Sequence, residues 1–115
     1  MSSSNLPINT LKIKSIDTAS LATSQTGTDV DVREVLAAAI QTVWSGGSGA
    51  GGTIYIEGSI DGSNYNNIAS TLVAADSGSF LVNLERMGYT IIRARWARTS
   101  GSAGTITATC TAKRM

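Results

Sequence analysis

The sequence of 115 residues contains no histidine and only one cysteine, one proline and one phenylalanine. Without histidine, the chain lacks the side chain that most often serves as general base and zinc ligand at neutral pH. A single cysteine, Cys110, excludes an intrachain disulfide and every CxxC metal motif. These absences remove Ser-His-Asp, Cys-His and zinc-hydrolase mechanisms together. We therefore expect no enzyme activity, no cofactor, no metal site and no small-molecule substrate.

Charge is also scarce. Charged residues make up 15% of the chain, against about a quarter in an average globular domain, and the formal net charge is +1. Such a balance creates no field that would attract nucleic acid or a membrane surface. No stretch reaches the roughly 18 apolar residues of a membrane span, and the first residues lack the basic and apolar regions of a signal peptide. We expect a protein made in the cytoplasm, without a membrane partner.

The sequence matches itself when it is shifted by 52 positions. Trp44 then falls on Trp96, and Thr53-Ile54 falls on Thr105-Ile106. The further matches are Ile16 with Ile68, Val30 with Val82, Ile40 with Ile92, and Ser48-Gly49 with Ser100-Gly101. Two such β units, each with one apolar face, can bury these faces against each other. We infer an all-β fold, an antiparallel β-sandwich built from two repeated units that pack face to face.

Alternation of apolar and polar residues predicts the individual strands and their faces. The expected strands cover 11–16, 29–35, 38–44, 53–59, 79–84, 89–98 and 105–112, and the glycine-rich segments 46–52 and 100–104 are interpreted as flexible hairpin loops. Segment 32–44 also has high helix propensity. Its counterpart 89–96 is rich in β-branched and aromatic residues, so a strand from Ala38 is favoured, with a turn of helix over Arg33–Ala37 as the alternative.

The alternation places Trp44, Trp96 and Cys110 in phase with the core. It places Tyr55 and Glu57 on the outward face of one strand, and Arg93 and Arg95 on the outward face of another. Most carboxylates are interpreted as single residues in turns or on outward strand positions, and Asp29 and Asp31 are interpreted as solvated strand residues. Segment 59–65, which contains Asp61-Gly62, faintly resembles a calcium loop, but it lacks the ligand set and is better explained as a tight turn.

Partner contacts are predicted from what remains. Residues 1–10 are polar, lack a strand period and contain the proline, so they predict an N-terminal arm that orders on a partner, ahead of a single sandwich domain over 11–115. The candidate partner-binding residues are Leu6, Pro7 and Ile8 in this arm, Arg93 and Arg95, and the tyrosines Tyr55, Tyr65 and Tyr89.

Two motif-bearing runs resemble a known group of proteins. Gly52–Tyr65 places a Gly-Thr-hydrophobic opening ahead of Ser-x-Asp-Gly-x-x-aromatic, and Tyr89–Ile106 has an aromatic-x-hydrophobic-hydrophobic-Arg strand followed by a Thr-Ser-Gly turn. With the Gln-x-Val-Trp-x-Gly pattern of Gln41–Gly46, they resemble small structural proteins of tailed bacteriophages over roughly residues 28–113. The sequence departs from that pattern at Tyr65, where tryptophan is expected, and in its longer glycine loop.

The resemblance implies a virion protein made in the host cytoplasm. It implies a homo-oligomer that binds other virion proteins such as the major capsid protein, most simply as a capsid decoration or cement protein, with tail, neck and fibre positions as alternatives. Two other classes stay open. Exposed tyrosines would suit a carbohydrate-binding β-sandwich module, whereas Arg93 and Arg95 would suit a single-stranded nucleic-acid binder, for which the strand offers few stacking aromatics.

Overall fold

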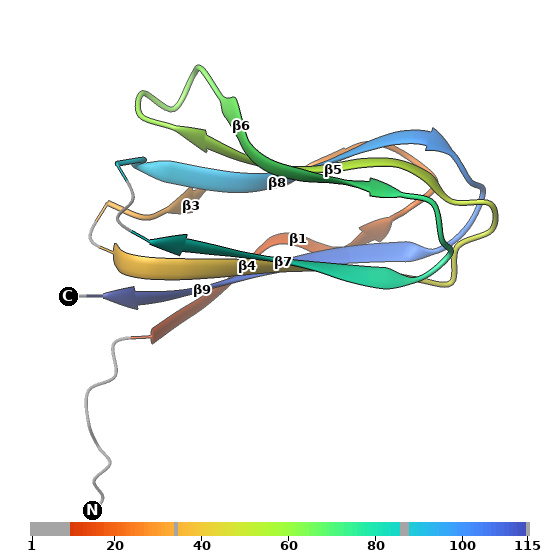
Figure 1. Cartoon of the computed structure of the whole chain (residues 1–115), viewed down its shortest axis with the longest axis horizontal. Coiled ribbons are helices and arrows are strands. Elements are labelled where there is room, and N and C mark those ends of the chain that lie inside the picture. Colours follow the sequence, from red (N-terminus) through yellow and green to blue (C-terminus); the bar gives the residue numbers. More distant parts are fainter. Residues whose placement is uncertain (1–9, 34, 86–87, 115) are drawn as a thin grey trace, which may run out of the picture.

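The chain folds into two antiparallel sheets that lie one above the other (Figure 1). The computed structural model describes residues 10–33, 35–85 and 88–114, with the side chains of residues 10, 11, 36 and 114 left aside. The strands are β1 (Thr10–Ser20), β2 (Gln25–Thr26), β3 (Val30–Asp31), β4 (Val35–Ser45), β5 (Gly51–Ser59), β6 (Asn66–Val73), β7 (Gly78–Glu85), β8 (Ile91–Ser100) and β9 (Thr105–Arg114). The predicted all-β class is confirmed.

One sheet has the order β1-β9-β4-β7, and the other has the order β2-β8-β5-β6, with β3 also pairing with β8. Every pairing is antiparallel. The predicted antiparallel β-sandwich is therefore confirmed. Segment 35–45 is strand β4, so the strand is correct and the helical alternative is wrong over 35–37. None of the described residues belongs to a helix long and apolar enough to cross a membrane.

The 52-residue repeat is present in the backbone pairing, but its two copies are arranged differently from the prediction. The pairing of Ile40 with Cys110 becomes Ile92 with Gly58 when 52 is added to one number and subtracted from the other, and this second pairing is observed. The same operation turns Trp44–Ile106 into Trp96–Ile54, Ile40–Val82 into Ile92–Val30, and Ser20–Thr105 into Leu72–Thr53, all of which occur. An approximate twofold relation thus exchanges the two sheets.

Each sheet consequently takes strands from both copies. In the first copy, β1 and β4 belong to one sheet while β2, β3 and β5 belong to the other. The expectation that two separate units pack face to face is therefore wrong. The glycine-rich segments are not hairpin loops either, because β4 and β5, like β8 and β9, lie in different sheets. Positive φ angles of 67° at Gly49 and 111° at Gly101, again 52 positions apart, allow both chain crossings.

The core lies between the sheets and follows the predicted faces. Ile92, Ala94 and Trp96 of β8 are 0% exposed, and Trp44 of β4 is 7% exposed. The inward residues of β9 are also buried, namely Ile106, Ala108, Cys110 and Ala112. The indole Nε1 of Trp96 donates to Leu21 O (3.0 Å) and that of Trp44 donates to Ala75 O (3.0 Å). Both tryptophans are thus core residues that anchor neighbouring loops.

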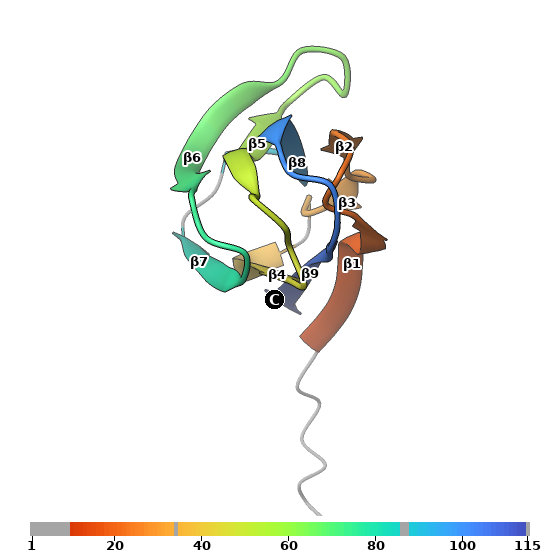
Figure 2. The same cartoon turned by 90° about the vertical axis from the view of Figure 1, so that its right-hand side faces the viewer.

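Several boundaries differ from the prediction. The strand expected over 29–35 is reduced to Val30–Asp31, and β8 begins at Ile91 rather than at residue 89. Strands β2 and β6 were not predicted. Thr10 begins β1, whereas Leu6, Pro7 and Ile8 lie outside the described residues. Figure 2 shows that β6 and β7 border one side of the sandwich and that β1, β2 and β3 border the other.

Candidate docking surface

The outward face of the sheet that contains β5 and β8 carries a closed network of ionic groups. Glu57 lies on the outward face, as predicted, but it is only 7% exposed. Its carboxylate accepts from Nε of Arg93 (3.0 Å) and Nε of Arg95 (2.9 Å). Burial alone would raise the pKa of Glu57, but the hydrogen bonds and charges of Arg95 and Arg93 outweigh it and leave the pKa below its ordinary value.

Two tyrosine rings complete this network. The guanidinium carbon of Arg93 lies 3.5 Å from the ring centre of Tyr65, and that of Arg95 lies 4.2 Å from the ring centre of Tyr55. The hydroxyl of Tyr65 donates to both carboxylate oxygens of Asp29 (2.8 Å each), which raises the pKa of Tyr65. Each ring therefore already has a cation on one face.

The structure shows where the predicted tyrosine and arginine partner-binding residues lie. Tyr55, Tyr65 and Tyr89 are half-buried rather than exposed. The charges of Arg93 and Arg95 face the carboxylate of Glu57, so this part of the sheet does not present a bare basic patch. Tyr89 lies elsewhere, beside Gly58 at the end of β5. The structure brings together four of the predicted residues, Tyr55, Tyr65, Arg93 and Arg95, but as an internally satisfied cluster.

The Asp61 turn is organised by its own backbone. The Oδ1 atom of Asp61 accepts from the backbone N–H groups of Ser63 (2.8 Å) and Asn64 (2.8 Å), and Oδ2 accepts from Asn64 Nδ2 (2.7 Å). Hydrogen bonds from Asn64 and then Ser63 hold the pKa of this carboxyl well below its usual range. Gly62 has a φ of 76°. The interpretation of this segment as a tight turn is therefore confirmed, and the described residues contain no group of three or more acidic or cysteine side chains that could hold a metal ion.

The outward face of the other sheet has a different character, although the repeat makes the two faces equivalent. Under the 52-residue shift, Tyr55 and Glu57 correspond to Thr107 and Thr109 on β9. Arg93 and Arg95 correspond to Gln41 and Val43 on β4. The pairings Gln41–Thr109 and Val43–Thr107 place these four side chains side by side, as Arg93–Glu57 and Arg95–Tyr55 are on the opposite face. A charged network on one face is thus replaced by a neutral surface on the other.

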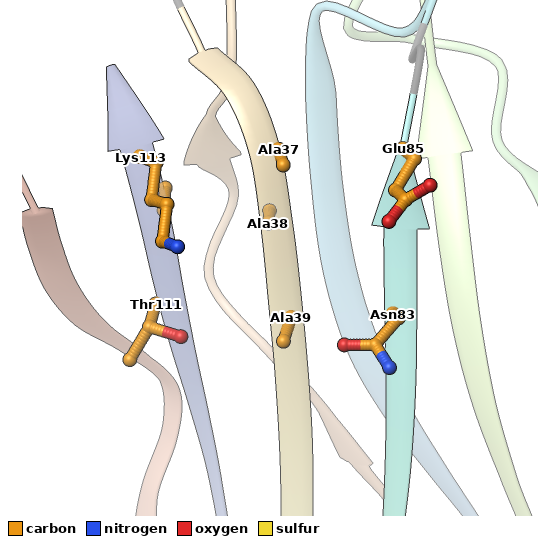
Figure 3. A pocket seen from close by; sticks show the side chains of 8 residues that line it. Ala37, Ala38, Ala39, Asn83, Glu85, Thr111 and Lys113 are labelled. Carbon is orange, nitrogen blue, oxygen red and sulfur yellow. The ribbon is translucent and has the colours of Figure 1, made fainter.

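This neutral face, defined by the outward residues of β9, β4 and β7, is extended by small side chains. Ala37 and Ala39 of β4 lie between Thr111 and Lys113 of β9 and Asn83 and Glu85 of β7 (Figure 3). The small alanine side chains leave a shallow hollow of about 220 Å³ between these neighbours. One acidic and one basic side chain, Glu85 and Lys113, flank the hollow at its outer end. The hollow can thus receive small side chains, with charges of both signs at its rim.

Farther along the neutral face, two apolar side chains are exposed. Val43 of β4 is 46% exposed and Leu81 of β7 is 57% exposed, and neither alternation nor the repeat predicted them as contact residues. Leu81 pairs with Gln41, which pairs with Thr109, so these residues form one row across three strands. Exposed apolar side chains among uncharged neighbours are typical of surfaces that bind another protein. The sequence signal was available, since Phe80-Leu81-Val82 is the one run in β7 where apolar residues occupy both faces.

The four borders of the sandwich differ in how well they are protected against pairing with a further strand. β1 contains two register shifts and the positive φ of Thr18 (51°), and it carries Lys12 and Lys14. β6 contains a register shift, and β2 and β3 have two residues each. Bulges, lysines and short length are devices that prevent edge pairing. β7 has eight residues, pairs with β4 without any shift and carries no basic residue. Among the described strands, β7 is the unprotected border.

The cysteine does not take part in any surface. Cys110 is 1% exposed, as predicted, and burial raises its pKa to about 11. A buried thiol of this kind is unreactive.

No protein-family model and no curated protein matches the sequence. Among solved structures, the chain is similar to the SPBc2 prophage-derived protein YomS, with 12% identity over 90% of this chain and 92% of that one and a TM-score of 0.56. It is also similar to a chain from the structure "Bacillus endospore appendages form a novel family of disulfide-linked pili", with 16% identity over 92% of this chain and 87% of that one and a TM-score of 0.54. At these identities the likeness establishes the fold, which is shared over nearly the full length.

Proposed function

We propose that the chain is a non-enzymatic structural subunit of a bacteriophage particle, which binds the capsid shell in many copies as a decoration protein. The observation that carries the proposal is the neutral face with its exposed Val43 and Leu81, next to an unprotected border strand. A monomer in solution gains nothing from either feature, whereas a subunit in an assembly buries both. Multiple copies also make a modest contact sufficient, because binding of each copy is reinforced by its neighbours.

The two structural neighbours support this class of function. One is derived from a prophage and the other belongs to disulfide-linked pili. A tail, neck or fibre position, or a pilus-like appendage, would use the same surfaces with a different partner. The disulfide linkage of those pili does not carry over to this chain, because Cys110 is buried.

The carbohydrate-binding alternative has less support. A sugar ring would need the open face of an aromatic side chain, and in this fold Tyr55 and Tyr65 each have an arginine on one face. The nucleic-acid alternative meets a similar difficulty, since Glu57 neutralises the two arginines that would contact phosphate.

The test is to add purified protein to phage capsids that lack it and to count the bound copies by cryo-electron microscopy and quantitative mass spectrometry. Saturable binding at a fixed number of copies per capsomer supports the proposal. Leu81→Lys should weaken this binding at least tenfold, while Leu72→Lys, a change at an 80% exposed leucine outside the neutral face, should leave it unchanged. Absence of binding to capsids, combined with binding to tails or filaments, would instead support an appendage position.

A further inference from the structure

The open border of β7 has backbone groups available for another strand. The N–H of Leu21 donates to Gly104 O (3.0 Å), so the carbonyl of Gly104, the residue before β9, is on the side of β1. By alternation, the backbone groups of the even-numbered residues of β9 are also on the side of β1. Because neighbouring residues of a strand point their backbone groups to opposite sides, the odd-numbered residues of β9 bond β4. The even-numbered residues of β4 then bond Phe80 and Val82, since Thr42 pairs with Phe80 and Ile40 with Val82. The backbone groups of Ser79, Leu81 and Asn83 are therefore directed to the open side.

The bonding pattern of the other sheet agrees with this assignment. The N–H of Gly27 donates to Ala94 O (2.8 Å), so Ala94 directs its backbone toward β2 and away from β5. Ala94 is the repeat counterpart of Thr42, whose backbone is directed toward β7 by the alternation along β4. Two independent hydrogen bonds therefore leave the same groups of β7 without a strand partner among the described residues.

Residues 1–10 as a whole lack a strand period, but one short segment within them has the right pattern to fill this border. Residues 5–9 read Asn-Leu-Pro-Ile-Asn. In an extended segment, Leu6 and Ile8 share one face and one backbone edge, while Pro7 has its nitrogen on the opposite edge. A strand that bonds β7 through Leu6 and Ile8 thus loses no hydrogen bond at Pro7. The proline then prevents a further strand from adding outside it, as proline does on edge strands.

The position of β1 indicates that the acceptor is a second copy. β1 and β7 are opposite borders of the same sheet, separated by β9 and β4, which is a distance of about 14 Å. Thr10 begins β1 at the row that also contains Lys113, Ala37 and Glu85. Ile8 and Leu6 precede Thr10 by two and four residues, so an extended chain carries them at most about 7 Å and 14 Å from Thr10. A strand added outside β7 would lie about 19 Å from β1, so Leu6 and Ile8 cannot reach the β7 border of their own chain, and the acceptor is a second copy.

We propose that residues 5–9 of one copy pair as an added strand with the open border of β7 in a second copy, with Leu6 and Ile8 beside Leu81. The inference deepens the proposed function, on which it rests, because it specifies how neighbouring copies of the subunit are joined. The contact is head-to-tail, since an arm and a border are different surfaces, and such contacts generate rings or open arrays. Leu81 changes from an exposed side chain into the centre of a small apolar cluster.

Intermolecular disulfide trapping with the full-length chain tests the contact. Leu6→Cys or Ile8→Cys protein, carrying a size tag, is mixed with untagged Leu81→Cys protein under mild oxidation, with Leu72→Cys as the matched control on β6. The buried Cys110 stays unreactive. We expect a mixed disulfide with Leu81→Cys at least tenfold more abundant than with Leu72→Cys, since paired strand residues have the Cα separation a disulfide needs.

Three results would overturn the inference. The first is an equal yield with the control, and the second is a dominant Leu81→Cys homodimer, which would indicate twofold pairing of β7 with itself. The third is a purely intramolecular disulfide in a dilute chain that carries both Leu81→Cys and Ile8→Cys. An equal yield, together with saturable capsid binding that Leu81→Lys weakens, would refute the arm contact and leave the proposed function intact. Strong trapping of the mixed disulfide without any capsid binding would refute the proposed function and leave the arm contact intact.

Discussion

Replacing Glu57 by glutamine tests whether the ionic network on the β5–β8 face stabilises the fold. The carboxylate has 9% side-chain exposure, and its two partners have 21% (Arg93) and 34% (Arg95). Breaking a fully buried ion pair costs about 3–5 kcal/mol, and the solvent near Arg95 reduces this figure. Glutamine also keeps one acceptor oxygen. We expect Glu57→Gln to lower the free energy of unfolding by about 2 kcal/mol at pH 7, or about 8 °C in Tm for a chain of this length.

The sign of the pH dependence follows from the lowered pKa of Glu57. A carboxyl whose pKa is lower in the folded state than its ordinary value of 4.5 contributes stability above that value, and this contribution is lost as the pH falls through the folded pKa. The difference between wild type and Glu57→Gln should therefore be largest at neutral pH and shrink below pH 4.5. Added salt should shrink it only slightly, because partly buried pairs are screened less than exposed ones.

The assay is urea unfolding followed by the fluorescence of the buried Trp44 and Trp96, repeated between pH 7 and pH 3. Glu85→Gln, a change at an exposed carboxylate of β7, is the matched control and should stay within about 0.5 kcal/mol of wild type. If Glu57→Gln were as stable as Glu85→Gln at pH 7, or if its deficit persisted unchanged at pH 3, the ion pairs would contribute nothing to stability and the reasoning would be refuted.

Three further predictions concern the core and the chain crossings. The hydroxyl of Thr42 is buried without a hydrogen-bond partner among the described residues, so Thr42→Val should stabilise the fold by about 1 kcal/mol in urea unfolding, and destabilisation would contradict this. Gly104 has a φ of 104° and a β-carbon there would lie 2.7 Å from Ser45 O, so Gly104→Ala should lower Tm by several degrees, whereas Gly88→Ala, which meets nothing within 4 Å, should not. The Cys110 thiol should react with a chromogenic disulfide reagent only as fast as the chain unfolds, and rapid labelling of native protein would be inconsistent with its burial.

The strands and core could be predicted because they depend on local alternation and on the repeat. Ile106, Ala108 and Cys110 alternate with threonines, and this pattern alone determines which face is buried. The repeat also resolved segment 35–45, where helix propensity pointed the other way. Strand β6 was missed because its sequence, NNIASTLV, is half polar and gives a weak alternating signal.

The arrangement of the strands could not be predicted in the same way. A glycine loop can close a hairpin or cross to the other sheet, and only the pairing of distant strands decides between them. The burial of Glu57 has the same origin, since residues 57, 93 and 95 meet only through the β5–β8 register. The repeat was visible in the sequence, but the exchange of strands between its copies was not. The docking surface was missed because it is defined by an absence: the β9–β4–β7 face lacks the charged network that the equivalent β5–β8 face has.

The exchange of strands has a consequence for how the chain can be rearranged. The start of β1 and the end of β9 are neighbours, since Thr10 pairs with Lys113, and the Asp61 turn lies between β5 and β6. A circular permutant that joins the old ends and opens at this turn would run from β6 to β9 and then from β1 to β5. Under the twofold relation β1, β4 and β5 exchange places with β6, β8 and β9, and β2 and β3 together exchange places with β7, so the permuted chain has the same overall topology as the original. Fusion of two copies of a half-length chain would produce such a fold, if each copy could close the sandwich only by pairing with the other.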